Sequence, residues 1–99
     1  MSTGAEIKVP FHNHVSYHIS ADGYPDTIGP FLKELIDKAR DMDGEFLDNL
    51  ELVFRRENDG MDGRLDGRQQ NQYVDFVYRI DEDGNIFYKR ESEADWSEL

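Results

Sequence analysis

The sequence contains no cysteine and no long apolar run. Without cysteine, disulfide bonds, thiol catalysis and cysteine-based zinc sites are excluded. A membrane-spanning helix needs about 20 consecutive apolar residues, and no stretch comes near that length. The first residues, MSTGAEIK, also lack the basic and then apolar pattern of a signal peptide. We therefore expect a cytoplasmic protein that has no contact with membranes.

Positive charge is scarce as well. The chain has 11 lysines and arginines against 22 aspartates and glutamates, which gives a formal net charge of −11. Such a surface repels phosphate groups, so direct binding of nucleic acid is not expected. Three interpretations of the acidity stay open: solubility of an ordinary domain, adaptation to high salt, and mimicry of a nucleic-acid surface that is presented to a basic protein.

The length of 99 residues is typical of a single domain. We expect one domain over residues 1–99, with flexible tails at 1–6 and 91–99. Residues 58–71 contain three Asp-Gly pairs and little that is apolar, which predicts a mobile loop. A calcium site in that loop is not expected, because its aspartates lack the alternate spacing and the final glutamate of a calcium loop.

Apolar and polar side chains alternate over residues 14–20. This alternation predicts a half-buried strand. Any strand over residues 7–11 would be confined to a sheet edge by Pro10, which has no backbone N–H to donate.

A turn and a helix are predicted to follow this strand. The Asp-Gly-Tyr-Pro run at residues 22–25 has the composition of a tight turn. Apolar residues then recur every three or four positions, which predicts an amphipathic helix. We expect Asp26 or Thr27 to cap this helix, Pro30 to lie in its first turn, and Gly44 to follow its end in a left-handed conformation.

The remaining elements complete an α+β fold. Helical spacing predicts a second helix over 45–57, and two alternating runs at 73–80 and 86–89 predict a hairpin whose loop contains Gly84. The order is β-α-α-β-β. We expect a three-stranded, largely antiparallel sheet in which the strand at 14–20 pairs with the hairpin, covered on one face by two helices.

The strand-to-helix junction resembles a motif of small, uncharacterised bacteriophage and prophage proteins. Those proteins carry Tyr-Arg-His-Trp-Asp-Gly-Tyr-Pro, then a helix, and end in a strand pair. Here the matching residues are His18 and the run at 22–25, followed by Ile-Gly-Pro-Phe-Leu. The chain departs from the motif by having Ile-Ser-Ala before Asp22 in place of one tryptophan, and by lacking the arginine. The resemblance implies the fold and an origin in a phage or mobile element, and it implies no established activity.

Three histidines, His12, His14 and His18, fall on one face if residues 11–20 form one regular strand. A His-x-His pair on a strand can bind a metal ion, but a closed zinc site needs four ligands. His12 and His18 would also lie about 20 Å apart at ~3.3 Å per residue. We therefore predict no metal site and no cofactor, and we expect solvated histidines that titrate near pH ~6.5.

The candidate binding residues lie at the junction and in the long loop. His14, His18, Asp22 and Tyr24 could converge at the end of the strand to receive a partner or ligand, although Asp22 and Tyr24 also have a sufficient role in shaping the turn. The loop could add positively charged contacts. The full set of candidates is His14, His18, Asp22, Tyr24, Arg64 and Arg68.

The absence of nucleophile, phosphate-loop and metal-hydrolase motifs favours a protein without catalysis of its own. The leading hypothesis is a small acidic interaction protein of phage or mobile-element type. It would bind a host protein, such as a defence or DNA-handling protein, through its acidic surface. One alternative is a minimal metal- or ligand-binding enzyme that uses His14, His18, Asp22 and Tyr24. Another is an ordinary domain adapted to high salt, and a homodimer through the polar strand face also stays open.

Overall fold

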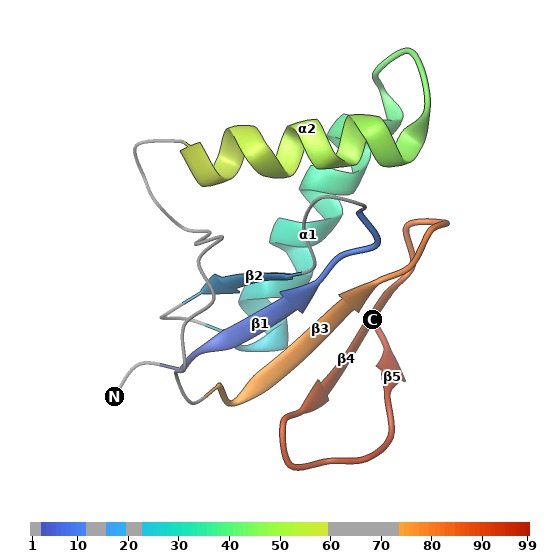
Figure 1. The fold of residues 1–99 in the computed structure, drawn as a ribbon. Coiled ribbons are helices and arrows are strands. Elements are labelled where there is room, and N and C mark those ends of the chain that lie inside the picture. The colour runs from blue at the N-terminus through green and yellow to red at the C-terminus, as the bar shows by residue number, and fades with distance from the viewer. Residues whose placement is uncertain (1–2, 12–15, 20–22, 60–73) are drawn as a thin grey trace.

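A computed structural model describes residues 3–11, 16–19, 23–59 and 74–99 of the chain (Figure 1). Two helices and a five-stranded mixed sheet confirm the predicted α+β class. The elements are β1 (Ala5–Lys8), β2 (Ser16–Ile19), α1 (Pro25–Arg40), α2 (Phe46–Asp59), β3 (Phe76–Ile80), β4 (Ile86–Arg90) and β5 (Ser97–Glu98). No helix among these residues is long and apolar enough to cross a membrane.

The sheet differs from the predicted three strands. Its order is β2-β1-β3-β4-β5, with β1 parallel to β3 and the other neighbouring pairs antiparallel. The predicted pairing of β2 with the hairpin is therefore wrong, because β1 lies between them. Pro10 does not force β1 to the edge, since the strand ends at Lys8, before the proline.

Both predicted tails contribute to the sheet. Ala5 and Ile7 are fully buried in β1, so the tail predicted at 1–6 is in part a central strand. At the other end, β5 pairs with β4, and the Leu99 N–H donates to the Ile86 carbonyl at 2.9 Å. Each strand was missed because an alternation of two to four residues is too short to stand out from its surroundings.

Helix α1 buries the predicted apolar stripe on the sheet. Its start differs from the prediction: Tyr24 is the N-cap residue, in extended conformation, and no side chain caps the helix. Pro25 occupies the first turn, where its fixed φ suits a helix and its missing N–H costs nothing. The helix therefore begins earlier than Asp26, and Pro30 lies inside it. Gly44 has the predicted positive φ of 105°.

The second helix and the hairpin confirm their predictions. Helix α2 follows Glu45, and β3 and β4 are joined by a turn in which Gly84 has a φ of 85°. The predicted loop 58–71 begins inside α2, because the helix extends to Asp59, and the rest of it lies outside the described residues.

One core joins both helices to the same face of the sheet. Alternate strand residues point into it, and Figure 1 shows α1 passing behind β1 while α2 crosses at one end. The largest fully buried side chains are Tyr78, Phe54, Ile7, Leu32, Leu35, Leu50 and Ile80. We call this side of the sheet the covered face. The opposite side, over which no described helix lies, is the helix-free face.

Candidate functional site

Two of the predicted site residues, His18 and Tyr24, lie in the described part of the chain; His14, Asp22, Arg64 and Arg68 lie outside it. His18 is paired with Glu6 across the β2–β1 ladder, and its Nε2 lies 3.4 Å from a Glu6 carboxylate oxygen. The His18 Nδ1 is buried and has no hydrogen-bond partner among the described residues. The sequence predicts solvated histidines, but His18 instead lies against a neighbouring carboxylate.

Tyr24 lies at the start of α1, where it is the exposed large apolar residue of the described chain, with 53% of its surface accessible. Its ring meets Phe76 edge-on, with 5.6 Å between the ring centroids. An exposed tyrosine supported by a buried ring is a typical anchor for a protein partner.

The structure does not bring His18 and Tyr24 together. His18 and Val77 are both paired with Glu6, so they share the helix-free face. Phe76, against which Tyr24 packs, precedes Val77 and therefore points to the covered face. The predicted convergence of these two residues is wrong, because the alternation of the strands separates them. Among the described residues, no group of three or more His, Asp or Glu side chains could hold a metal ion.

A different site forms where the end of α1, the start of α2 and the β3–β4 turn meet. Exposed carboxylates lie on the segments that meet there, which are the α1–α2 connection, α2 and the turn. They are Asp41, Asp43, Glu45, Asp48, Glu82 and Asp83. We call this set the acidic end. Sequence analysis missed it because the hairpin turn is distant in the sequence from the α1–α2 connection, and the two come together only through contacts such as that of Arg40 with Asp83.

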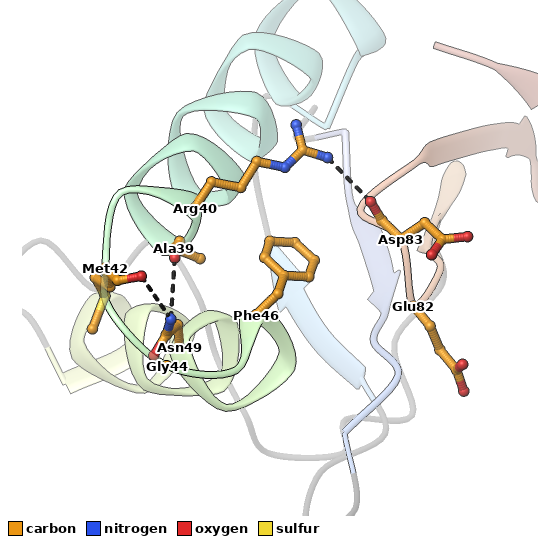
Figure 2. A pocket seen from close by; sticks show the side chains of 8 residues that line it. All are labelled: Ala39, Arg40, Met42, Gly44, Phe46, Asn49, Glu82 and Asp83. Carbon is orange, nitrogen blue, oxygen red and sulfur yellow. Dashed lines mark hydrogen bonds between the residues drawn. The ribbon is translucent and has the colours of Figure 1, made fainter.

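A hollow of about 340 Å³ opens in the acidic end (Figure 2). Phe46 and Met42 give it apolar walls, and Glu82 and Asp83 stand at its edge. The Arg40 guanidinium lies over the Phe46 ring, 5.5 Å from its centroid, and donates a hydrogen bond of 3.1 Å to the Asp83 carbonyl. The hollow therefore already holds one cation of the chain itself against an aromatic ring.

The α1–α2 connection is fixed by a buried asparagine. The Asn49 side-chain amide donates to the carbonyls of Ala39 and Met42, both at 3.3 Å. These carbonyls lie at and beyond the end of α1, where helical partners are lacking. Asn49 is 8% exposed and thus satisfies these groups from within the protein.

The β3–β4 turn is fixed by Asp81. One carboxylate oxygen accepts hydrogen bonds from the backbone N–H groups of Asp83 and Asn85, at 3.0 and 2.8 Å. Burial favours the neutral acid, but hydrogen bonds from Asn85, Asp83 and Gly84 outweigh it and hold the pKa of Asp81 below its ordinary value.

Gly84 lets this turn approach α1 and α2 closely. A Cβ atom there would lie 2.8 Å from an Arg40 guanidinium nitrogen and 3.0 Å from the Phe46 ring. Together with Asp81 and Asn49, this glycine sets the positions of the carboxylates at the acidic end.

Comparison of the chain with protein-family models, with curated proteins and with solved structures finds no match. The geometry of the described residues therefore carries the functional argument.

Proposed function

We propose that this protein is a non-catalytic binding protein whose acidic end binds a basic surface of a partner protein. The observation that carries the proposal is a hollow with apolar walls, lined by Glu82 and Asp83, between segments that carry four further exposed carboxylates. The net charge of −11 adds long-range attraction toward a basic partner.

Preorganisation supports binding at this place rather than mere solubility. The carboxylates stand on a connection held by Asn49 and on a turn held by Asp81. A partner therefore meets charges whose backbone is already fixed, which lowers the entropy lost on binding. Electrostatic complementarity of this kind speeds association and weakens as salt screens it.

The hollow indicates how basic side chains could be held. Lysine and arginine carry apolar stems that pack on apolar surface while their charged ends reach polar groups. Phe46 and Met42 offer such a surface, and Glu82 and Asp83 line the same hollow with their carboxylates turned outward (Figure 2). Arg40, stacked on Phe46, demonstrates that the ring accepts a guanidinium.

The nature of the partner is a further part of the proposal. The resemblance of the strand-to-helix motif to phage and prophage proteins supports a host protein as the target. A DNA-handling or defence protein has a basic surface that otherwise binds phosphates, and fixed carboxylates can occupy such a surface in place of nucleic acid. Competition between this protein and duplex DNA for a captured partner tests the mimicry.

The test is capture of partners from a bacterial lysate by the immobilised protein, with two variants of equal net charge. In the first, four carboxylates of the acidic end are neutralised: Asp41→Asn, Asp43→Asn, Glu82→Gln and Asp83→Asn. In the control, four exposed carboxylates elsewhere are neutralised: Asp26→Asn, Glu34→Gln, Glu91→Gln and Asp95→Asn.

We expect a partner that elutes as salt rises from about 0.05 M to 0.5 M, that is lost with the first variant and is kept with the control. Equal loss with both variants would show that net charge alone holds the partner, which contradicts a site at the acidic end. Unfolding of the free protein at low salt would instead favour the high-salt interpretation of its acidity.

A further inference from the structure

The helix-free face of the sheet carries a group of cations and aromatic rings, although the protein as a whole is strongly acidic. The strand registers place Lys8, Arg79 and Phe87 side by side across β1, β3 and β4. Lys89 lies two residues beyond Phe87 on the same face, and Trp96 lies over this group from the segment before β5. We call these five residues the basic–aromatic patch.

Arg79 is the centre of the patch. Its guanidinium lies 4.9 Å from the centroid of the Phe87 ring and 5.0 Å from that of Trp96. Two rings therefore lie beside the guanidinium, and Arg79 stays exposed to solvent. No carboxylate among the described residues forms a salt bridge with it. Arginine has five N–H donors in a planar fork, so this group is oriented for an oxyanion but has none from the described chain.

The neighbouring lysines extend the positive charge. Lys8, the cross-strand partner of Arg79, is exposed and forms no ion pair with the described residues. Lys89 lies 5.4 Å from the Trp96 ring centroid, and its ammonium donates to the Glu93 carbonyl at 2.7 Å. Neighbouring strands are about 4.8 Å apart, so Lys8 and Arg79 are close enough to bind adjacent oxyanions of one ligand.

We infer that the basic–aromatic patch is a second interaction surface, which binds a carboxylate-rich peptide segment of a protein partner. A carboxylate pairs with the fork of Arg79 in a bidentate manner, and a second carboxylate reaches Lys8. This surface is separate from the acidic end, and the inference does not depend on the function proposed above.

A peptide fits the patch better than single-stranded nucleic acid does. Bases bind by stacking on free aromatic faces, but here Arg79 and Lys89 already lie over the rings. The net charge of −11 also repels a long polyanion beyond the few residues in contact. On this face the three cations of the patch outnumber the carboxylates of Glu6 and Glu98. A short acidic segment therefore meets a local excess of positive charge and extends little into the negative field.

Trp96 gives a direct readout, because it is the only tryptophan in the chain. The probe is a ten-residue peptide of alternating Glu and Ser, added to the full-length protein at low salt while tryptophan fluorescence is followed. Calorimetry provides a second measurement that does not depend on Trp96. Control titrations use the same peptide with Gln in place of Glu, single-stranded oligothymidine, and inorganic phosphate.

The main variant is Arg79→Gln, which removes the charge but keeps a long side chain, and Lys8→Gln is the second. The matched control is Lys33→Gln, an exposed cation on α1. We expect Arg79→Gln to weaken binding of the acidic peptide about tenfold, as for loss of a charged hydrogen bond. Lys33→Gln should change it less than about twofold.

Several results would overturn the inference. One is the absence of any response to the acidic peptide, and another is saturable binding that neither Arg79→Gln nor Lys8→Gln weakens. The inference also fails if the Gln peptide binds equally well, or if oligothymidine binds more tightly than the acidic peptide. A fluorescence change that depends on protein concentration alone would assign the patch to contact between two copies and would also overturn it. If Arg79→Gln does not fold by circular dichroism, Lys8→Gln decides the outcome.

Discussion

The two faces of one sheet differ in nearly every physical respect, although the same strands supply both. On the covered face of β3, Phe76, Tyr78 and Ile80 are buried against the helices. On the helix-free face of the same strand, Arg79 stands exposed between two rings. The comparison teaches that alternate residues of one strand stabilise the fold, so that the exposed residues between them can be changed with little effect on stability.

Val77 is an exception to this difference between the two faces. It lies on the helix-free face but is 6% exposed, and it does not belong to the main core. Its ladder neighbours are Glu6 and Lys89. The helix-free face therefore also excludes water at its centre, and its charges are arranged around a small apolar spot.

The largest effect is expected on the covered face. Leu35 is 1% exposed and lies in the α1 stripe that packs on the sheet. Leu35→Ala should lower the free energy of unfolding by ~2–5 kcal/mol, because the truncation loses buried area and leaves a cavity. Urea denaturation followed by circular dichroism measures this. A loss below about 0.5 kcal/mol, the range of surface substitutions, would mean that the stripe does not face the sheet.

A smaller effect is expected from one buried hydrogen bond on the same face. The Tyr78 hydroxyl donates to the Gly23 carbonyl at 2.6 Å and so ties β3 to the backbone two residues before the start of α1. Tyr78→Phe should cost about 1–2 kcal/mol, because the buried carbonyl loses its partner. Tyr88→Phe is the matched control, because the Tyr88 hydroxyl forms no hydrogen bond with the described residues.

The same hydroxyl predicts a pH dependence. Burial, together with the nearby charges of Tyr88 and Asp26, raises the pKa of Tyr78 above its ordinary value. The folded state therefore holds this proton more tightly than the unfolded state, whose tyrosine pKa is about 10. This stabilisation is complete below that pH and is lost as the pH rises above it. Urea denaturation at increasing alkaline pH should show a decline in the free energy of unfolding that is shallower in Tyr78→Phe than in the wild-type protein.

On the helix-free face the effect on stability should be smaller still. Arg79→Ala removes two cation–π contacts, each worth ~0.5–1 kcal/mol at an exposed site, so we expect a loss of about 1 kcal/mol. Arg90→Ala, which removes one such contact with Phe76, should cost about half as much. Thermal unfolding compares the two. A loss with Arg79→Ala as large as that with Leu35→Ala would mean that the two faces are not divided as described.

The parts of the fold that the sequence predicts are those with long periodicity. The α1 stripe spans about three turns at 3.6 residues per turn, and the hairpin is marked by two alternating runs around a glycine. Strand β1 could not be predicted, because four alternating residues before a proline give no preference for the centre of a sheet over an edge. Its parallel pairing with β3 depends on contacts about 70 residues away, which local patterns do not contain.

The sites were harder to predict than the elements. Alternation placed His18 on a polar face correctly, but the direction of Tyr24 depends on Phe76, which is distant in the sequence. The acidic end requires the hairpin turn to pack beside α1, and nothing in the sequence of residues 81–85 specifies that neighbour. The basic–aromatic patch was hidden because Trp96 lies in a segment whose composition predicts a flexible tail.

The smallest effect is expected at Lys38, one helical turn from Leu35 but on the solvent side of α1. Its ammonium lies 3.6 Å from the Glu34 carboxylate, and the side chains are 56% and 66% exposed. Lys38→Ala should cost less than about 0.5 kcal/mol, because solvent screens exposed pairs and the helix gains an alanine. The part of this cost that comes from the ion pair should vanish in about 1 M salt, where the screening length is only ~3 Å. Urea denaturation of Lys38→Ala and Leu35→Ala under the same conditions checks this. A cost at Lys38 that is comparable to that at Leu35 and persists in salt would show that this side of α1 is packed, and that the helix contacts something beyond the sheet.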